Sequence, residues 1–419
     1  MELRRYLEQL QSEGELVTVD EPMAYGDVPA RVMAEEEADN RALLFTNVAD
    51  YQGKIAFNTF GTQQRINRAL GADDTTSFFE GIDAAIAAPK PLKLVPADTT
   101  GYQVISEPNL LEHIPAILSS RHDSTPYITS GLVVARDPDS GRHHVCYIRM
   151  SVQESNRVLV NPRTFRIRDI AAKTVGAGKP WDITILIGAP TNAALPGGMS
   201  LPDDVDELEV IQALGGETQT FLDLDLPVPT GTEMILFGRV TPDEERPEGP
   251  FGELTGRYST RHNPVCEIVK LWQREDHVYH NILGGKSREH VLLVALKARH
   301  DLEQLMARSP HVLDYHLPRF GAGQLCLLTV ADGTPKQPLI DELFNITLVK
   351  LFVLINEDVP ADNSDDVLWA LAQRVRQRDD LHFSEADPSR GLAEIIVLDA
   401  TSDDLSDWNN IRIETMDKQ

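Results

Sequence analysis

A series of short β-rich runs lies between residues 130 and 280, and it restricts the possible folds more than any other feature of the chain. Turns rich in Pro, Gly and Asp separate the runs. Runs of this length, interrupted this often, are typical of a small β-barrel or sandwich. One helix, expected over 204–214 after acidic residues that suit a helix N-terminus, interrupts the series. The expected strands are 131–135, 145–152, 183–187, 233–240, 265–272 and 278–282.

Both flanks of this series alternate helical and apolar patterns, which predicts α/β structure. Expected helices are 3–13, 64–70, 290–308 and 367–375, and expected strands are 42–45, 54–57, 325–329, 350–355 and 394–398. A chain of 419 residues is too long for one ordinary core. We therefore expect a multi-domain α/β (α+β) protein divided into 1–105, 106–289, a linker helix 290–310, and 311–419.

Composition excludes several classes of protein. The net charge of -26, from 39 Lys and Arg against 65 Asp and Glu, argues against nucleic acid as the main partner. A small anionic substrate would need a local basic pocket. The three cysteines form no CxxC motif, which argues against a disulfide framework or a cysteine zinc site. The start of the chain has no apolar segment typical of a signal peptide, and no apolar run approaches the roughly 20 residues of a membrane span, so a cytoplasmic location is expected.

Residues 247–258 place two carboxylates, Glu248 and Glu253, on either side of a Gly-Pro-Phe-Gly segment. Gly and Pro disfavour a helix here and favour tight turns and close backbone approach. A rigid turn can hold two acids in a fixed relation, as general acid–base chemistry requires. Taken alone, the segment is more commonly a surface turn with two solvated glutamates.

Arg149 lies inside an otherwise apolar strand pattern, and alternation places Val145, Tyr147 and Arg149 on one face. A buried arginine needs a carboxylate or an anionic ligand, and Glu248 and Glu253 are the obvious candidates. Such a cluster would keep one carboxylate ionised beside Arg149 while a second, more desolvated one retains a proton near neutral pH. The residues alone fit a structural salt bridge equally well.

The Arg149 strand, the 247–258 segment and the strand 272–283 resemble the UbiD family of prenylated-FMN-dependent (de)carboxylases. The similarity continues in 43–60, in 202–216, and in 350–358 together with 367–372, so it spans nearly the whole chain. The resemblance implies an N-terminal α/β domain, a central split β-barrel that binds the cofactor, a linker helix, and a C-terminal α/β domain that forms a homodimer.

The resemblance also implies an activity: non-oxidative, reversible decarboxylation of an α,β-unsaturated or (hetero)aromatic carboxylic acid. The catalytic residues of the family fall on Arg149, Glu248 and Glu253, with Glu253 as the proton donor. A separate flavin prenyltransferase would supply the prenylated FMN. The substrate stays open among aromatic or heteroaromatic acids, acrylic acids and an isoprenoid-pathway enoic acid phosphate.

In the family, a divalent metal (Mn²⁺) and K⁺ hold the flavin phosphate through Asn, His and Glu ligands. Glu233 fits the Glu position, but the Asn position holds His144 and the His position holds Phe165, which cannot ligate a metal. A spacing of five places His144 and Arg149 on opposite faces of a regular strand, so both reach one cofactor only at a bulge or a strand end. The remaining cofactor-binding candidates are Val145, Ile148, Arg166 and Lys350, with Arg149 and Phe165 again.

Three arginines near Phe165 suggest a different solution, in which the guanidinium groups of Arg163, Arg166 and Arg168 bind the phosphate directly. Two other functions compete with the decarboxylase. A catalytically silent UbiD-like subunit or binding module is supported by Phe165. A split-barrel flavin oxidoreductase using FMN is opposed by the retention of both glutamates.

Overall fold

The computed structural model describes residues 1–49, 51–376, 378–386 and 394–402, without the side chains of residues 165 and 243. The chain forms two compact units, Met1–Val294 and Ala295–Gln419. No helix in the described ranges is long and apolar enough to cross a membrane. The finer division into four parts, with boundaries at 105/106, 289/290 and 310/311, stays a prediction.

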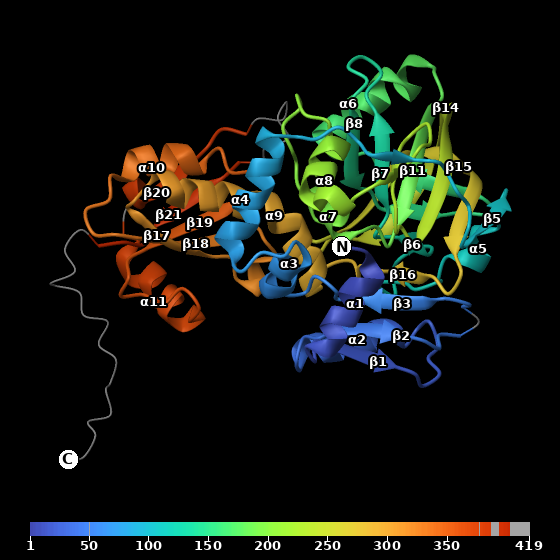
Figure 1. Ribbon diagram of the computed structural model, residues 1–419. Coiled ribbons are helices and arrows are strands. Elements are labelled where there is room, and N and C mark those ends of the chain that lie inside the picture. The colour runs from blue at the N-terminus through green and yellow to red at the C-terminus, as the bar shows by residue number, and fades with distance from the viewer. Residues whose placement is uncertain (50, 377, 387–393, 403–419) are drawn as a thin grey trace. The chain divides into compact units, whose positions relative to one another are not determined.

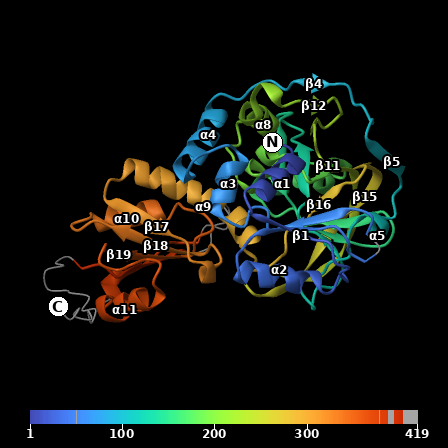
Figure 2. The ribbon, with the colours of Figure 1, turned by 60° about the horizontal axis from the view of Figure 1, so that its bottom comes forward.

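The first unit begins with a four-stranded sheet in the order β1-β2-β3-β16. Figure 2 shows it between helices α1 and α2, and Figure 1 shows the same elements from another side. Helix α1 buries Leu3, Tyr6, Leu7 and Leu10, which is the helical face that the sequence predicted. The elements are α1 (Leu3–Ser12), β1 (Leu16–Val19), α2 (Val28–Glu37), β2 (Ala42–Phe45), β3 (Lys54–Phe57) and β16 (Val278–His280).

Strand β16 corrects one sequence-based assignment. The run 278–282 was expected to continue the central β series, but β16 pairs in parallel with β3 of the N-terminal sheet. Its residues are buried on both faces, which suits a strand inside an α/β layer. The chain therefore returns to the first sheet after completing the central one.

The central sheet has nine strands, in the order β6-β9-β10-β15-β14-β11-β7-β8, with β5 paired to β15. Strand β8 is at one end of this order and β9 is next to the other end, yet only Ile148 and Arg149 separate them in sequence. The sheet must therefore curl round on itself. This is the split β-barrel that was expected. Its strands are β5 (Tyr102–Ser106), β6 (Tyr127–Ile128), β7 (Leu132–Arg136), β8 (His143–Tyr147), β9 (Met150–Val152), β10 (Arg157–Val160), β11 (Trp181–Ile187), β14 (Met234–Gly252) and β15 (Tyr258–Arg274).

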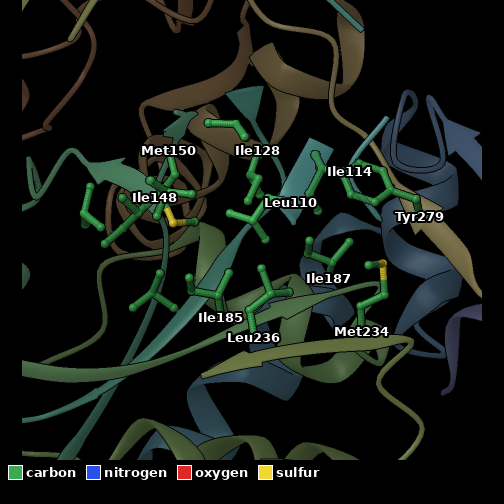
Figure 3. Close-up of a cluster of buried hydrophobic side chains, with 14 of the residues drawn as sticks. Leu110, Ile114, Ile128, Ile148, Met150, Ile185, Ile187, Met234, Leu236 and Tyr279 are labelled. Atoms are coloured by element: carbon green, nitrogen blue, oxygen red, sulfur yellow. The ribbon is translucent and has the colours of Figure 1, made fainter. Parts of the chain in front are cut away.

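Apolar side chains from several barrel strands form one buried cluster, drawn in Figure 3. Ile148 reaches it from the segment joining β8 to β9, and Met150 reaches it from the start of β9. Ile185 and Leu236 reach it from β11 and β14. The core therefore fixes the backbone on both sides of Arg149, which lies between Ile148 and Met150.

Helices pack around the barrel, and one of them was not predicted. Helix α8 matches the expected 204–214, whereas α6 was missed although Ile167, Ile170 and Ala171 have helical spacing and are buried. The remaining elements of this unit are α3 (Gln63–Ala69), α4 (Thr75–Ala87), α5 (Leu110–His113), α6 (Phe165–Lys173), α7 (Thr191–Ala194), α8 (Glu207–Gly215) and the small sheet β13-β12-β4 (Val228–Pro229, Phe221–Leu222, Leu94–Val95).

The second unit is built on a five-stranded sheet in the order β17-β18-β19-β21-β20. One apolar cluster contains residues of α10, and a second contains residues of α11, so the sheet has a core on each face. The elements are α9 (Arg288–Arg308), which crosses from the first unit, β17 (Val312–His316), β18 (Leu325–Val330), α10 (Lys336–Leu343), β19 (Leu351–Ile355), α11 (Ser364–Arg374), β20 (Leu381–Phe383) and β21 (Ile396–Asp399).

Candidate functional site

Arg149 lies where the barrel is split. Strand β8 ends at Tyr147 and pairs with β7, while β9 begins at Met150 and pairs with β6 and β10. Ile148, directly after β8, still bonds to the β7 side of the split, because its N–H donates to the carbonyl of Gly131, just before β7, at 2.9 Å. Arg149 therefore lies just beyond a strand end. The sequence spacing required either a bulge or a strand end if His144 and Arg149 were to reach one cofactor.

Glu248 lies in strand β14 beside a bulge, not in a turn. Glu248 is opposite Arg261 and Phe251 is opposite Ser259, so the pairing shifts across Gly249 and Pro250, which a cis peptide bond joins. Gly249 has φ +106°, and a Cβ atom there would lie 2.3 Å from the Ser259 carbonyl oxygen. The expected close backbone approach is therefore present, but the expected turn is not. Pairing of β14 with β15 continues on both sides of Gly249 and Pro250, which form a bulge.

The turn itself is formed by residues 253–257, closed by a bond from the Glu253 N–H to the Arg257 carbonyl at 2.9 Å. Glu253 thus begins the turn directly after β14 ends at Gly252. The bulge and the turn together direct two carboxylates, five residues apart, toward the same guanidinium.

Arg149 bonds to both carboxylates at once. Its Nη1 lies 2.7 Å from Glu253 Oε1, and its Nη2 lies 3.1 Å from Glu248 Oε2. The guanidinium carbon lies 4.4 Å from the centre of the Phe251 ring, a cation–π contact from the same bulged segment. Asn263 Nδ2 donates to Glu248 Oε2 at 2.9 Å. The structure therefore brings together the three residues that the sequence grouped as a catalytic trio.

The protonation expected of this cluster is not found at Glu253. Burial acts to raise the pKa of Glu253, but the hydrogen bond and charge of Arg149 outweigh it, with help from Ser259 and Arg163, and the pKa is lowered. Glu253 is therefore an ionised partner of Arg149 in this state. The Arg149 guanidinium reaches Glu253 directly, which is why its charge outweighs burial at this carboxylate.

A small cavity of about 130 Å³ adjoins the trio. Arg163 lies on its wall, with Nη1 3.5 Å from Glu253 Oε1. Burial, together with the nearby Arg261 and Arg149, lowers the pKa of Arg163. Positive charge therefore gathers here in a chain that is strongly acidic overall. The cavity is lined by Tyr147, Ile148, Arg149, Asn161, Arg163, Thr164 and Ile167.

A second buried cluster centres on Glu207, which the sequence did not single out. Glu207 Oε1 is 2.8 Å from His144 Nδ1 and 3.1 Å from Arg166 Nη1. Its Oε2 accepts from the Val145 N–H at 2.5 Å. Three of the expected cofactor residues therefore contact this one carboxylate at the start of α8. They are His144 and Val145 on β8 and Arg166 on α6. The acidic lead-in to the 204–214 helix was the signal that could have identified it.

The pKa of His144 is raised in this cluster. Burial acts to lower its pKa, but the interactions with Cys146 and Glu207 outweigh burial and raise the pKa to about 10.

Glu233 has a different set of partners. It is fully buried just before β14, and its two oxygens accept from Arg4 Nε at 2.7 Å and Arg4 Nη2 at 2.8 Å. Its Oε2 also accepts from the Val278 N–H at 2.9 Å. Glu233 therefore joins α1 and β16 to the barrel. Among the described residues, no group of three or more His, Cys, Asp or Glu side chains could hold a metal ion.

Two expected cofactor residues cannot be placed in either cluster. Phe165 is the first residue of α6, and its side chain lies outside the described part of the structure. Lys350 is exposed in the second unit, directly before β19. Their roles stay predictions.

Comparison with known proteins places the chain in a family of carboxy-lyases. The central 3-octaprenyl-4-hydroxybenzoate carboxy-lyase Rift-related domain matches residues 93–287, the N-terminal domain of the same family matches 7–85, and the C-terminal domain matches 291–404. All three parts occur in order along the chain. The chain belongs to the UbiD family.

Solved structures agree with this assignment. An evolved dimeric form of the UbiD-class enzyme HmfF from Pelotomaculum thermopropionicum, in complex with prFMN, is 26% identical over 99% of this chain and 97% of its own, with a TM-score of 0.86. Vanillic acid decarboxylase from Sedimentibacter hydroxybenzoicus, in open form with a truncated partner, is 25% identical over 100% and 96%, with a TM-score of 0.79. The apo 3,4-dihydroxybenzoic acid decarboxylase of Klebsiella pneumoniae shares the fold at 20% identity over 99% and 98%, with a TM-score of 0.82. The silent-subunit and oxidoreductase alternatives are not favoured.

Proposed function

We propose that this protein catalyses non-oxidative, reversible decarboxylation of an α,β-unsaturated or (hetero)aromatic carboxylic acid, using prenylated FMN. The observation that carries the proposal is the Arg149–Glu248–Glu253 cluster at the split of the barrel. A relative of similar fold is solved in complex with prFMN, which supports the choice of cofactor. When bound, that cofactor would supply the electron sink for the charge left as CO2 departs.

Arg149 would bind the carboxylate of the substrate. Its guanidinium is held from one side by Glu248, which is 1% exposed, and from another by the Phe251 ring. A planar guanidinium presents paired donors that match a carboxylate, so a fixed Arg149 would orient the bond that breaks. Glu248 would act on the substrate only through Arg149.

Glu253 would donate the proton that replaces CO2 on the substrate carbon. A substrate carboxylate that takes over Arg149 Nη1 removes the interaction that lowers the pKa of Glu253. Burial, which acts to raise that pKa, then dominates, and Glu253 takes up a proton from solvent. Each turnover consumes one proton and releases one CO2, so Glu253 returns to its ionised partnership with Arg149 afterwards.

The cofactor would lie along β8, α6 and the split of the barrel. The proposed contacts are His144, Val145, Ile148, Arg149, Phe165 and Arg166, and Lys350 stays a candidate from the sequence alone. Glu233 is a weaker member of this set, because Arg4 and Val278 already occupy its oxygens. A flavin prenyltransferase would supply the cofactor, and the dimeric form of HmfF supports a homo-oligomeric assembly.

Co-expression with a flavin prenyltransferase tests the proposal. The purified protein should carry a flavin with the mass and absorption spectrum of the prenylated form, and it should release CO2 from at least one acid in a panel of cinnamic, acrylic and heteroaromatic acids. Protein without flavin would point to a silent subunit. A reducible, unprenylated FMN without CO2 release would point to an oxidoreductase.

A further inference from the structure

The Glu207 cluster does not fit the divalent metal that the family resemblance implies. His144 and Glu207 meet, but the third side chain on Glu207 Oε1 is the Arg166 guanidinium at 3.1 Å. An arginine stays protonated and ligates no metal. Its fixed positive charge already neutralises the carboxylate that a metal ion would otherwise bind.

The same cluster has polar groups that no described residue satisfies. His144 is 4% exposed, its Nδ1 faces Glu207, and its Nε2 has no hydrogen-bond partner in the described part of the chain. Arg166 donates from Nη1 to Glu207 and from Nη2 to the Val205 carbonyl, which uses two of its five N–H groups. Because the Arg166 guanidinium is always charged, its remaining N–H groups indicate an anionic ligand that accepts hydrogen bonds.

Helix α6 adds a third source of positive potential. It is 9 residues long, its N-cap residue Thr164 makes no side-chain cap, and its first turn holds no acidic residue. The free N–H groups at such a helix start favour a phosphate or another anion. Thr164 Oγ1 lies 4.0 Å from Cys146 Sγ, so the start of α6 adjoins the strand that carries His144.

We propose that His144, Arg166 and the N-terminus of α6 bind the phosphate of the flavin directly, without a divalent metal ion. This inference rests on the proposed function, because it names what holds the cofactor of that site. Glu207 is a positioning residue that orients both side chains. Of the three arginines that the sequence suggested as phosphate-binding residues, we retain Arg166, since Arg163 contacts Glu253 and Arg168 is exposed.

Flavin binding by the wild-type protein provides the first test. The apoprotein is dialysed against EDTA in K⁺-free buffer, and FMN and riboflavin are titrated separately while flavin fluorescence is followed. We expect FMN to bind about tenfold or more tightly than riboflavin, because only FMN offers the charged acceptor. That ratio should be unchanged by EDTA, inorganic phosphate should compete with FMN only, and elemental analysis of the complex should find no stoichiometric divalent metal.

The outcomes separate this inference from the proposed function. FMN binding that requires Mn²⁺, or a stoichiometric metal in the complex, would overturn the direct phosphate contact and leave the decarboxylase proposal intact. Equal affinity for FMN and riboflavin would also overturn it, even if inorganic phosphate binds. Failure to bind either flavin would overturn both proposals.

Two variants locate the contact. Arg166→Gln and His144→Ala should each weaken FMN binding about tenfold and leave riboflavin binding unchanged. Arg168→Ala, an exposed position on the same helix, is the matched control and should bind both flavins normally. Unchanged FMN affinity in both variants would refute the assignment. Where a variant fails to fold, the metal dependence of the wild type still decides.

Discussion

Arg149 Nη1 lies 2.7 Å from Glu253 Oε1, so the proposed proton donor is ion-paired before any substrate is present. The two groups are 104 residues apart in sequence. In the proposed mechanism, the acid and the cation that binds the substrate carboxylate are therefore paired with each other in the free protein. Substrate would have to separate them before a proton could be transferred.

Replacement of Glu253 tests its role as the acid. Glu253→Gln should abolish CO2 release while flavin binding and the unfolding temperature stay close to those of the wild type, because glutamine keeps the shape and a hydrogen bond but cannot donate the proton. The matched control is Glu245→Gln, at an exposed position of the same strand. Retained turnover in Glu253→Gln would remove this residue as the acid.

Removal of the guanidinium should change the pH dependence of stability. The lowered pKa of Glu253 means that its ionised form stabilises the fold above the ordinary glutamate pKa of about 4.3. That stabilisation is lost as the pH falls through the lower folded-state pKa. In Arg149→Ala, burial raises the pKa of Glu253 instead.

The difference in unfolding free energy between wild type and Arg149→Ala should therefore be largest near pH 7 and should shrink below about pH 4. Urea unfolding over a pH series measures it. Arg136→Ala removes an exposed ion pair with Asp225 on the same barrel, and should change stability little at any pH. A pH-independent difference for Arg149→Ala would contradict the ion pairing described here.

The bulge beside Glu248 should tolerate no side chain at Gly249. Gly249→Ala places a Cβ atom 2.3 Å from the Ser259 carbonyl oxygen at φ +106°, so we expect a loss of roughly 2–3 kcal/mol in stability and weaker activity. Gly256→Ala is the control, because Gly256 also has a positive φ of +75° but its Cβ would meet nothing within 4 Å. If Gly249→Ala and Gly256→Ala lose equal stability in thermal unfolding, then the positive φ, and not the contact with the Ser259 carbonyl, causes the loss.

The Arg4–Glu233 pair should be a stability determinant. Glu233 is 0% exposed, so Arg4→Ala leaves a buried carboxylate with only the more distant Arg274, at 3.6 Å, as its cation. We expect a loss of roughly 3 kcal/mol in unfolding free energy, measured in urea. Arg5→Ala, at the exposed neighbouring position, should be nearly neutral. An unfolding free energy unchanged in Arg4→Ala would show that Arg4 is not needed to balance the buried Glu233.

Much of the fold could be predicted because its signals are local. The helical face of α1 and the strands 42–45 and 54–57 depend on patterns within a few residues. The turn chemistry of Gly249 and Pro250 was also local, but pairing of β14 with β15 overrode it and produced a bulge. The place of 278–282 in the first sheet depends on a partner strand more than 200 residues away, which no local pattern encodes.

In the site, too, some features could be predicted from the sequence and others depend on long-range contacts. The grouping of Arg149 with Glu248 and Glu253 followed from the need of a buried arginine for carboxylates, and it agrees with the geometry. The protonation of Glu253 could not be predicted, because it depends on which guanidinium nitrogen reaches which oxygen. Glu207 was missed for a similar reason, since its partners His144 and Arg166 lie 63 and 41 residues away.

The split of the barrel at Ile148 and Arg149 has a kinetic consequence. Strands that are consecutive in sequence lie near opposite ends of the sheet order, so Arg149 reaches Glu248 and Glu253 only after contacts spanning 99 and 104 residues have formed. Contacts of such sequence separation form slowly, because loop-closure entropy must be overcome first. Catalytic competence should then emerge late in refolding, after most secondary structure, and it would serve as a direct reporter of barrel closure.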